Sequence, residues 1–166
     1  MKFVFLDIDG VLNDIELHRM MEWGGKKWGW DWVRPLLVKK LNTIIERTGA
    51  LVVVSSSWRQ KWTKQELQTI LDEQGFVGEV ASVTPVLEDP RFYAERGPVF
   101  PDRSDEVLEW IGLCKHASPG IDIRYVVLDD RGEFFQNTPG INIVLTDGDV
   151  GLTDEDVERA VEILNE

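Results

Sequence analysis

Short apolar runs alternate along the chain with segments in which apolar residues recur every three or four positions. Residues 2–6, KFVFL, are a short apolar run that ends at an acidic residue, and this pattern predicts a buried strand. Similar runs predict strands at 50–54, 123–128 and 141–145, and a weaker run predicts one at 77–83. None of these runs approaches the ~20 apolar residues that a membrane-spanning helix requires.

Helical spacing of the apolar residues appears between and after these runs. Pro35 suits the first turn of a helix over 35–48. Thr63 and the Glu three residues later predict a capping box that opens a second helix. A third helix is predicted over about 104–115, and a fourth begins after Thr153 as its cap.

The alternation of strands and helices predicts an α/β fold with a doubly wound parallel sheet. Residues 1–166 are expected to form one domain, because this length suits a single core. The stretch 84–103 contains four prolines and is predicted to be a loop. In such sheets the ligand binds beyond the carboxyl ends of the strands, so the residues that follow each strand are the candidates for a site.

Carboxylates, hydroxyls and guanidinium groups follow three of the predicted strands. Several carboxylates at one edge of a sheet repel one another when all of them are ionised. A hard cation that takes oxygen ligands relieves that repulsion. Mg²⁺ fits such a set best, while the hydroxyl and guanidinium groups suit the oxygens of a phosphate. The residues concerned are Asp7, Asp9, Ser55, Ser56, Ser57, Arg59, Asp129, Asp130 and Arg131.

Phosphate monoesters hydrolyse extremely slowly without a catalyst, so electrostatic clamping of the phosphoryl group must supply most of the acceleration. A carboxylate nucleophile divides the reaction into two easier halves. The sequence therefore predicts a magnesium-dependent hydrolase of phosphate monoesters.

Three segments resemble the haloacid dehalogenase (HAD) superfamily of phosphotransferases. They are FLDIDGVL at 5–12, the apolar strand that ends at Ser55, and VVLDD at 126–130. The resemblance covers nearly the whole chain and implies that Asp7 attacks phosphorus and becomes an aspartyl phosphate. It also implies that Asp9 protonates the leaving group and later activates water.

The same resemblance implies the remaining site residues. Magnesium would be held by Asp7, by the backbone carbonyl of Asp9, and by Asp129 or Asp130. The phosphoryl group would be bound by Ser55, with Ser56 as a substitute. The family places a Lys or Arg near the start of the helix before the acidic pair, and Arg103 holds that place, with Arg91 and Arg96 as rivals. An Arg there favours bidentate contact.

Within the superfamily, SSSWR and LDDR look like the small phosphatase domains of nucleic-acid repair proteins, including polynucleotide kinase-phosphatases. This likeness depends on Arg59 and Arg131, which are the candidate substrate-binding arginines. No kinase P-loop accompanies it. The expected partner is a phosphorylated small molecule, a nucleotide or a nucleic-acid end. The net charge of −12 argues against tight binding to duplex nucleic acid.

Residues 13–33 form a tryptophan-rich insert after the first strand, at a place where the superfamily can carry a cap. The insert is too short for a cap domain, so a flap or hairpin is expected, and Trp28, Trp30 and Trp32 alternate as in a strand. Two interpretations stay open. The indoles, Trp30 in particular, either cover the substrate or pack in a core.

Other classes of function are left open by the sequence alone. A receiver-type signalling module also uses an acidic pocket with Mg²⁺, and a catalytically retired domain could bind a phosphorylated partner. The phosphoryl group could also pass to an alcohol rather than to water. The single cysteine, Cys114, excludes an internal disulfide, and a reducing cytoplasm is the expected compartment.

Overall fold

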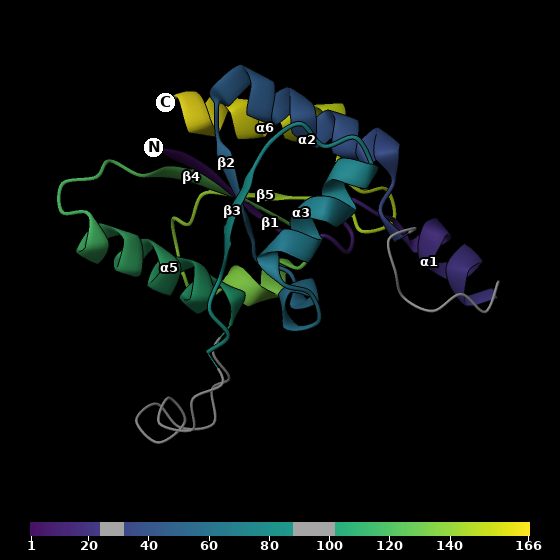
Figure 1. The fold of residues 1–166 in the computed structure, drawn as a ribbon, viewed down its shortest axis with the longest axis horizontal. Helices are drawn as coiled ribbons and strands as arrows, with labels where there is room; N and C mark the ends of the chain where they lie inside the picture. The colour runs from purple at the N-terminus through teal and green to yellow at the C-terminus, as the bar shows by residue number, and fades with distance from the viewer. Residues whose placement is uncertain (24–31, 88–101) are drawn as a thin grey trace.

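The computed structural model describes residues 1–23, 32–87 and 102–166 (Figure 1). Its centre is a five-stranded, all-parallel sheet with the strand order β3-β2-β1-β4-β5. The first strand therefore lies in the middle of the sheet, between β2 and β4. The strands are β1 (Lys2–Leu6), β2 (Leu51–Val54), β3 (Val80–Val83), β4 (Arg124–Asp129) and β5 (Ile143–Leu145).

Helices cover both faces of this sheet, with α2, α3 and α6 on one side and α5 on the other (Figure 1). The helices are α1 (Ile15–Trp23), α2 (Pro35–Thr48), α3 (Lys64–Glu73), α5 (Arg103–Ala117) and α6 (Asp154–Asn165), with short 3₁₀ turns η2 (Ser57–Gln60) and η3 (Gly132–Phe135). Within the described ranges, no helix has the length and apolar character needed to cross a membrane.

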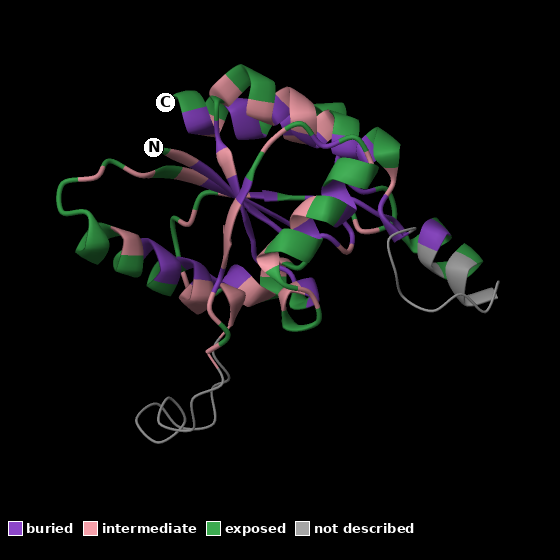
Figure 2. Ribbon diagram, in the orientation of Figure 1, coloured by how far each residue is buried: buried purple, intermediate pink, exposed green. Residues whose placement is uncertain are grey.

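The alternation of side chains along the strands divides the core into two parts, and the strands at the centre of the sheet are buried on both faces (Figure 2). Val4 and Leu6 of β1 pack in the larger core under α2, α3 and α6. Phe3 and Phe5 point to the other face, where both rings meet Trp110 of α5 edge to face, at centroid distances of 4.9 and 5.3 Å.

The predicted doubly wound α/β fold is confirmed, and each predicted strand and helix has a counterpart in the structure. Within the described residues, capping boxes begin at Thr63, Asp102 and Thr153. The box at Thr63 and the N-cap at Thr153 are as predicted. The predicted loop over 84–103 is irregular at 84–87 and lies outside the described residues at 88–101, whereas Arg103 already belongs to α5.

The insert at 13–33 begins with the helix α1, which was not predicted. The flap or hairpin stays a prediction, because residues 24–31 lie outside the described residues. The side chain of Asp14 accepts a hydrogen bond from the Leu17 amide (2.8 Å), as an N-cap residue does, and this local contact starts the helix. Trp32 is buried in the larger core, which agrees with the packing interpretation for that residue. Trp28 and Trp30 lie outside the described residues.

Candidate active site

The carboxyl ends of the three central strands place the predicted site residues side by side. The Asp7 amide donates to the Leu128 carbonyl (2.9 Å), and the Ser55 amide donates to the Leu6 carbonyl (2.8 Å). These hydrogen bonds continue the parallel ladders of β1 with β4 and β2 by one residue past Leu6. Asp7, Ser55 and Asp129 are thus brought to one edge of the sheet by backbone pairing alone.

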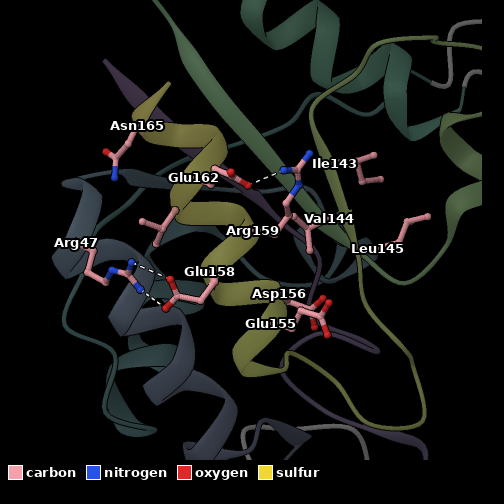
Figure 3. Close-up of a pocket in the computed structure, with 11 residues that line it drawn as sticks. Arg47, Ile143, Val144, Leu145, Glu155, Asp156, Glu158, Arg159, Glu162 and Asn165 are labelled. Atoms are coloured by element: carbon pink, nitrogen blue, oxygen red, sulfur yellow. Dashed lines mark hydrogen bonds and ion pairs between the residues drawn. The ribbon is translucent and has the colours of Figure 1, made fainter.

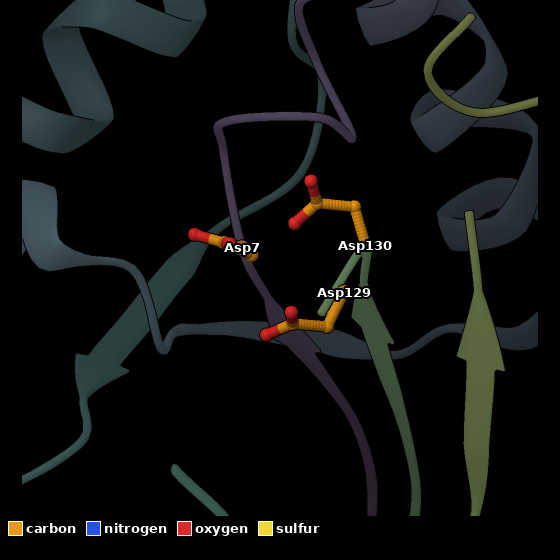
Figure 4. A group of neighbouring side chains, drawn as sticks. All are labelled: Asp7, Asp129 and Asp130. Carbon is orange, nitrogen blue, oxygen red and sulfur yellow. The ribbon is translucent and has the colours of Figure 1, made fainter. Parts of the chain in front are cut away.

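Three carboxylates gather at this edge (Figure 4). One oxygen from each of Asp7, Asp129 and Asp130 lies within 4.8 Å of the others. Asp7 and Asp129 are buried, and Asp130 is partly exposed. Burial raises the pKa of Asp129 to about 7, with a further contribution from the charge of Asp7, while Arg103 opposes the shift. Burial likewise raises the pKa of Asp7, against the attraction of Arg103.

Arg103 joins two of these carboxylates from the first turn of α5. Its Nη1 atom lies 2.6 Å from Oδ2 of Asp7 and 2.6 Å from Oδ2 of Asp129. The helix that carries it is fixed at its start by a capping box, in which Asp102 accepts from the Ser104 and Asp105 amides. Arg103 therefore lies next to Asp7, as expected. The rivals Arg91 and Arg96 lie outside the described residues.

Asp129 and Asp130 have different surroundings. Both oxygens of Asp129 accept hydrogen bonds, Oδ2 from Arg103 and Oδ1 from the Arg131 amide (2.8 Å). The carboxylate of Asp130 lies between two glycines: an added Cβ on Gly10 would be 2.4 Å from its Cγ, and one on Gly148 would be 2.7 Å from its Oδ2. The lack of side chains at these two positions gives Asp130 the space it occupies.

The side chain of Asp9 is not part of the carboxylate cluster. Its Oδ1 accepts a hydrogen bond from Asn13 Nδ2 (2.8 Å), and its Oδ2 accepts one from Trp58 Nε1 (3.0 Å). Asn13 also accepts from the Gly10 amide (2.8 Å) and donates to the Trp32 carbonyl (3.0 Å), so it ties the loop after β1 together. Sequence reasoning missed Asn13 and gave no role to Trp58.

A family model described as the HAD domain in Swiss Army Knife RNA repair proteins matches residues 3–157. The chain belongs to this family. The HAD resemblance seen in the sequence is therefore confirmed, and membership indicates a hydrolase of the phosphatase type. Comparison with curated proteins and comparison with solved structures both find no match.

Two serines of the HAD domain lie beside Asp7, after β2. Both are fully buried. The Ser55 hydroxyl has no hydrogen-bond partner among the described residues, and a buried hydroxyl without a partner is unfavourable unless a ligand supplies one. The Ser56 hydroxyl bonds to the Asp7 carboxylate and so opposes the rise in the pKa of Asp7, and it accepts from the Trp58 amide (3.4 Å) at the start of η2.

The guanidinium group of Arg59 is held by protein acceptors. It donates to the carbonyls of Ser56 (2.6 Å) and Thr84 (3.1 Å) and forms an ion pair with Glu106, and its side chain is 4% exposed. Glu106 lies one turn after Arg103 in α5, so the pair fixes η2 against the start of that helix. This geometry shows a bracing contact for Arg59, and sequence reasoning missed Glu106.

Arg131 has a more open position. Its side chain is 54% exposed, and its Nε donates to Glu133 (2.7 Å). Its guanidinium carbon lies 4.6 Å from the centroid of the Phe134 ring, and that of Arg103 lies 5.1 Å from the same ring. Phe134 therefore links the exposed Arg131 to the partly buried Arg103 through cation–π contacts.

Among the cavities on the described part of the HAD domain are a small one beside Arg103 and a larger one beside α6. One of about 170 Å³ borders Arg103 and is lined by Ser57, Arg59, Gln60, Asp102, Arg103, Glu106 and Phe134. The other, of about 700 Å³, lies between α6 and β5 (Figure 3). There Arg47 pairs with Glu158, and Arg159 pairs with Glu162. Neither cavity is lined by the clustered carboxylates. The smaller one borders Arg103, which bonds to Asp7 and Asp129, so it is the better candidate for the approach to Asp7.

Proposed function

We propose that this HAD domain is a magnesium-dependent phosphomonoester hydrolase that works through an aspartyl phosphate on Asp7. The observation that carries the proposal is the position of Asp7 at the end of the central strand, buried beside two other carboxylates and hydrogen-bonded to Arg103. A nucleophile in this place is shielded from bulk water. It is flanked by a fixed cation that can bind the oxygens of a phosphoryl group.

In the first half of the proposed reaction, one carboxylate oxygen of Asp7 attacks phosphorus and the bond from phosphorus to the leaving oxygen breaks. Asp9 gives its proton to that oxygen. In the second half, Asp9 takes a proton from water as the water oxygen attacks phosphorus, and the bond to Asp7 breaks. One ester and one water become one alcohol and one phosphate, and both aspartates are restored.

The phosphoryl group would be held by the hydroxyl groups after β2 and by the guanidinium of α5. The unpartnered hydroxyl of Ser55 supports this role, because a phosphoryl oxygen would give it the partner it lacks in the described structure. Ser56 and Arg103 already contact the Asp7 carboxylate, so they lie where donors to the transferred group are needed.

The residues present fit a divalent cation. Three carboxylates converge with raised pKa values at Asp7, Asp129 and Asp130, and hard oxygen donors suit Mg²⁺. We propose that these carboxylates and the backbone carbonyl of Asp9 hold the ion. When bound, Mg²⁺ supplies positive charge that offsets the carboxylates and the charge of the phosphoryl oxygens.

The substrate that we propose is a nucleotide or a nucleic-acid phosphate end. The family description, a domain of RNA repair proteins, supports this choice. The net charge of −12 favours a small or single-stranded substrate over a duplex. Arg131 is exposed beside the site and is the arginine best placed to meet a second phosphate, while Arg59 and Trp30 stay predictions as substrate contacts.

A panel assay tests the proposal. Phosphate release would be measured from 5′-nucleotides, 3′-phosphorylated oligonucleotides and small sugar phosphates, each with Mg²⁺ and with EDTA. We expect many phosphates per chain from at least one nucleic-acid substrate, and none with EDTA. Retention of about one phosphoryl group per chain, without turnover, would indicate a receiver-like module instead. No release from any substrate with Mg²⁺ present would refute the proposal.

A further inference from the structure

The carboxyl group of Asp9 is held at both oxygens by donors from different parts of the chain. Asn13, in the same loop, donates to Oδ1, and Trp58, from η2 and 49 residues away, donates to Oδ2 at 3.0 Å. Asn13 and Trp58 are both buried. A hydrogen bond on each oxygen fixes the plane of a carboxyl group, and so it fixes the direction in which the group can give or take a proton.

The two donors differ in what else they do. Asn13 also bonds to the Gly10 amide and the Trp32 carbonyl, so a change at Asn13 would disturb the loop as a whole. The indole N–H of Trp58 points at Asp9 from a ring that packs in the larger core, against Trp62 at a centroid distance of 4.8 Å. Trp58 can therefore lose its donor while much of its packing is kept.

We infer that Trp58 is a positioning residue for Asp9, and that its indole N–H orients the carboxyl group for proton transfer to the leaving oxygen. This inference rests on the proposed function and adds to it a residue that does not touch the substrate. It also gives a physical reason for the Trp after the serines: η2 places the ring under the Asp9 loop while Ser56 caps the same turn.

Paired substrates with different leaving groups test the inference. Trp58→Phe removes the indole N–H, and Trp62→Phe is the matched control on the neighbouring ring. An alkyl phosphate needs a proton on its leaving oxygen, whereas p-nitrophenyl phosphate does not. We expect Trp58→Phe to lower kcat/KM about tenfold or more for the alkyl phosphate, within the range of general acid catalysis. We expect a change of about twofold or less for p-nitrophenyl phosphate.

The outcomes separate this inference from the proposed function. Wild-type protein that releases phosphate from neither ester nor from any substrate of the panel assay, with Mg²⁺ present, overturns both. Active wild-type protein whose Trp58→Phe variant loses the same factor on both esters, or behaves like Trp62→Phe, overturns the inference alone. An equal loss on both esters is what a purely structural role predicts.

A second measurement does not depend on activity or on the stability of the Trp58 variant. The indole N–H signals of the seven tryptophans are recorded by NMR for the wild type and for Asp9→Asn. We expect the assigned Trp58 signal to move more than any other, because its acceptor changes from a charged to a neutral group. An unmoved Trp58 signal would show that the contact is absent in solution and would reject the inference.

Discussion

The Nη1 atom of Arg103 lies 2.6 Å from Oδ2 of Asp7, although 96 positions separate the two residues in the chain. The contact joins the end of the central strand to the first turn of α5. It places a permanent positive charge beside the proposed nucleophile, which opposes the rise in the pKa of Asp7 that burial causes.

Asp7→Asn is expected to abolish turnover while the fold is kept. The amide is nearly the same size as the carboxylate but is a poor nucleophile, and loss of a nucleophile costs on the order of 10⁶-fold in a well-studied hydrolase. Steady-state phosphate release and circular dichroism check both parts. Asp122→Asn, at an exposed position, is the matched control. Near wild-type activity in Asp7→Asn would reject Asp7 as the nucleophile.

Arg103→Met is expected to destabilise the protein strongly in the absence of divalent metal. Removal of the guanidinium leaves Asp7 and Asp129 buried and facing each other, and breaking a buried pair costs about 3–5 kcal/mol. Thermal unfolding with EDTA measures this loss, and added Mg²⁺ should restore part of it. Arg159→Met removes an exposed ion pair and should change the unfolding free energy by no more than about 1 kcal/mol.

If Arg103→Met unfolds at the wild-type temperature in EDTA, the guanidinium does not offset the charge of the carboxylates. The same unfolding experiment also tests whether the wild-type protein binds Mg²⁺. A wild-type protein whose unfolding temperature is the same with EDTA and with millimolar Mg²⁺ would speak against a magnesium site, because an ion that binds only the folded state raises stability by mass action.

Gly148→Ala is expected to weaken Mg²⁺ binding. The new methyl carbon would lie 2.7 Å from Oδ2 of Asp130, so the carboxylate must shift from its place in the cluster. Isothermal titration calorimetry measures the change in affinity, for which we expect at least about tenfold, or about 1.4 kcal/mol. Gly112→Ala is the control. It lies within α5 with open space around it, and it should raise stability by about 1 kcal/mol without a change in Mg²⁺ affinity.

Unchanged Mg²⁺ affinity in Gly148→Ala would mean that Asp130 does not ligate the ion. Of the two residues predicted as alternative ligands, Asp129 would then be the one that holds the ion. Its two oxygens are already fixed by hydrogen bonds from Arg103 and the Arg131 amide.

Much of the site could be predicted from the sequence because parallel strands end at one edge. Asp7, Ser55 and Asp129 follow apolar runs, so the backbone ladder alone brings them together. The bracing contacts could not be predicted in this way. The pair of Arg59 with Glu106 depends on the angle between η2 and α5, which no local pattern encodes.

The loop after β1 shows a second limit of sequence reasoning. Asn13 follows Gly10 by three positions, which is the spacing of a turn. Its other two partners lie at very different distances along the chain: Asp9 is four positions away and Trp32 is nineteen positions away. The helix α1 was missed because the alternation of Trp28, Trp30 and Trp32 favoured a strand in the same insert. The cap at Asp14 was the local signal for that helix.

Acid should remove the contribution of the Asp14–Arg34 pair to stability. Burial raises the pKa of Asp14, but hydrogen bonds from Arg34 and from the Leu17 amide outweigh it, so the folded-state pKa lies below its ordinary value. The pair therefore stabilises the fold above pH about 4 and loses this effect as the pH falls through the folded-state pKa. We expect Asp14→Asn, which can still cap α1, to lose about 1 kcal/mol at pH 7, a difference from wild type that shrinks toward pH 3. Urea unfolding across this pH range measures it, and a difference that stays constant would show that the charge of Asp14 contributes nothing.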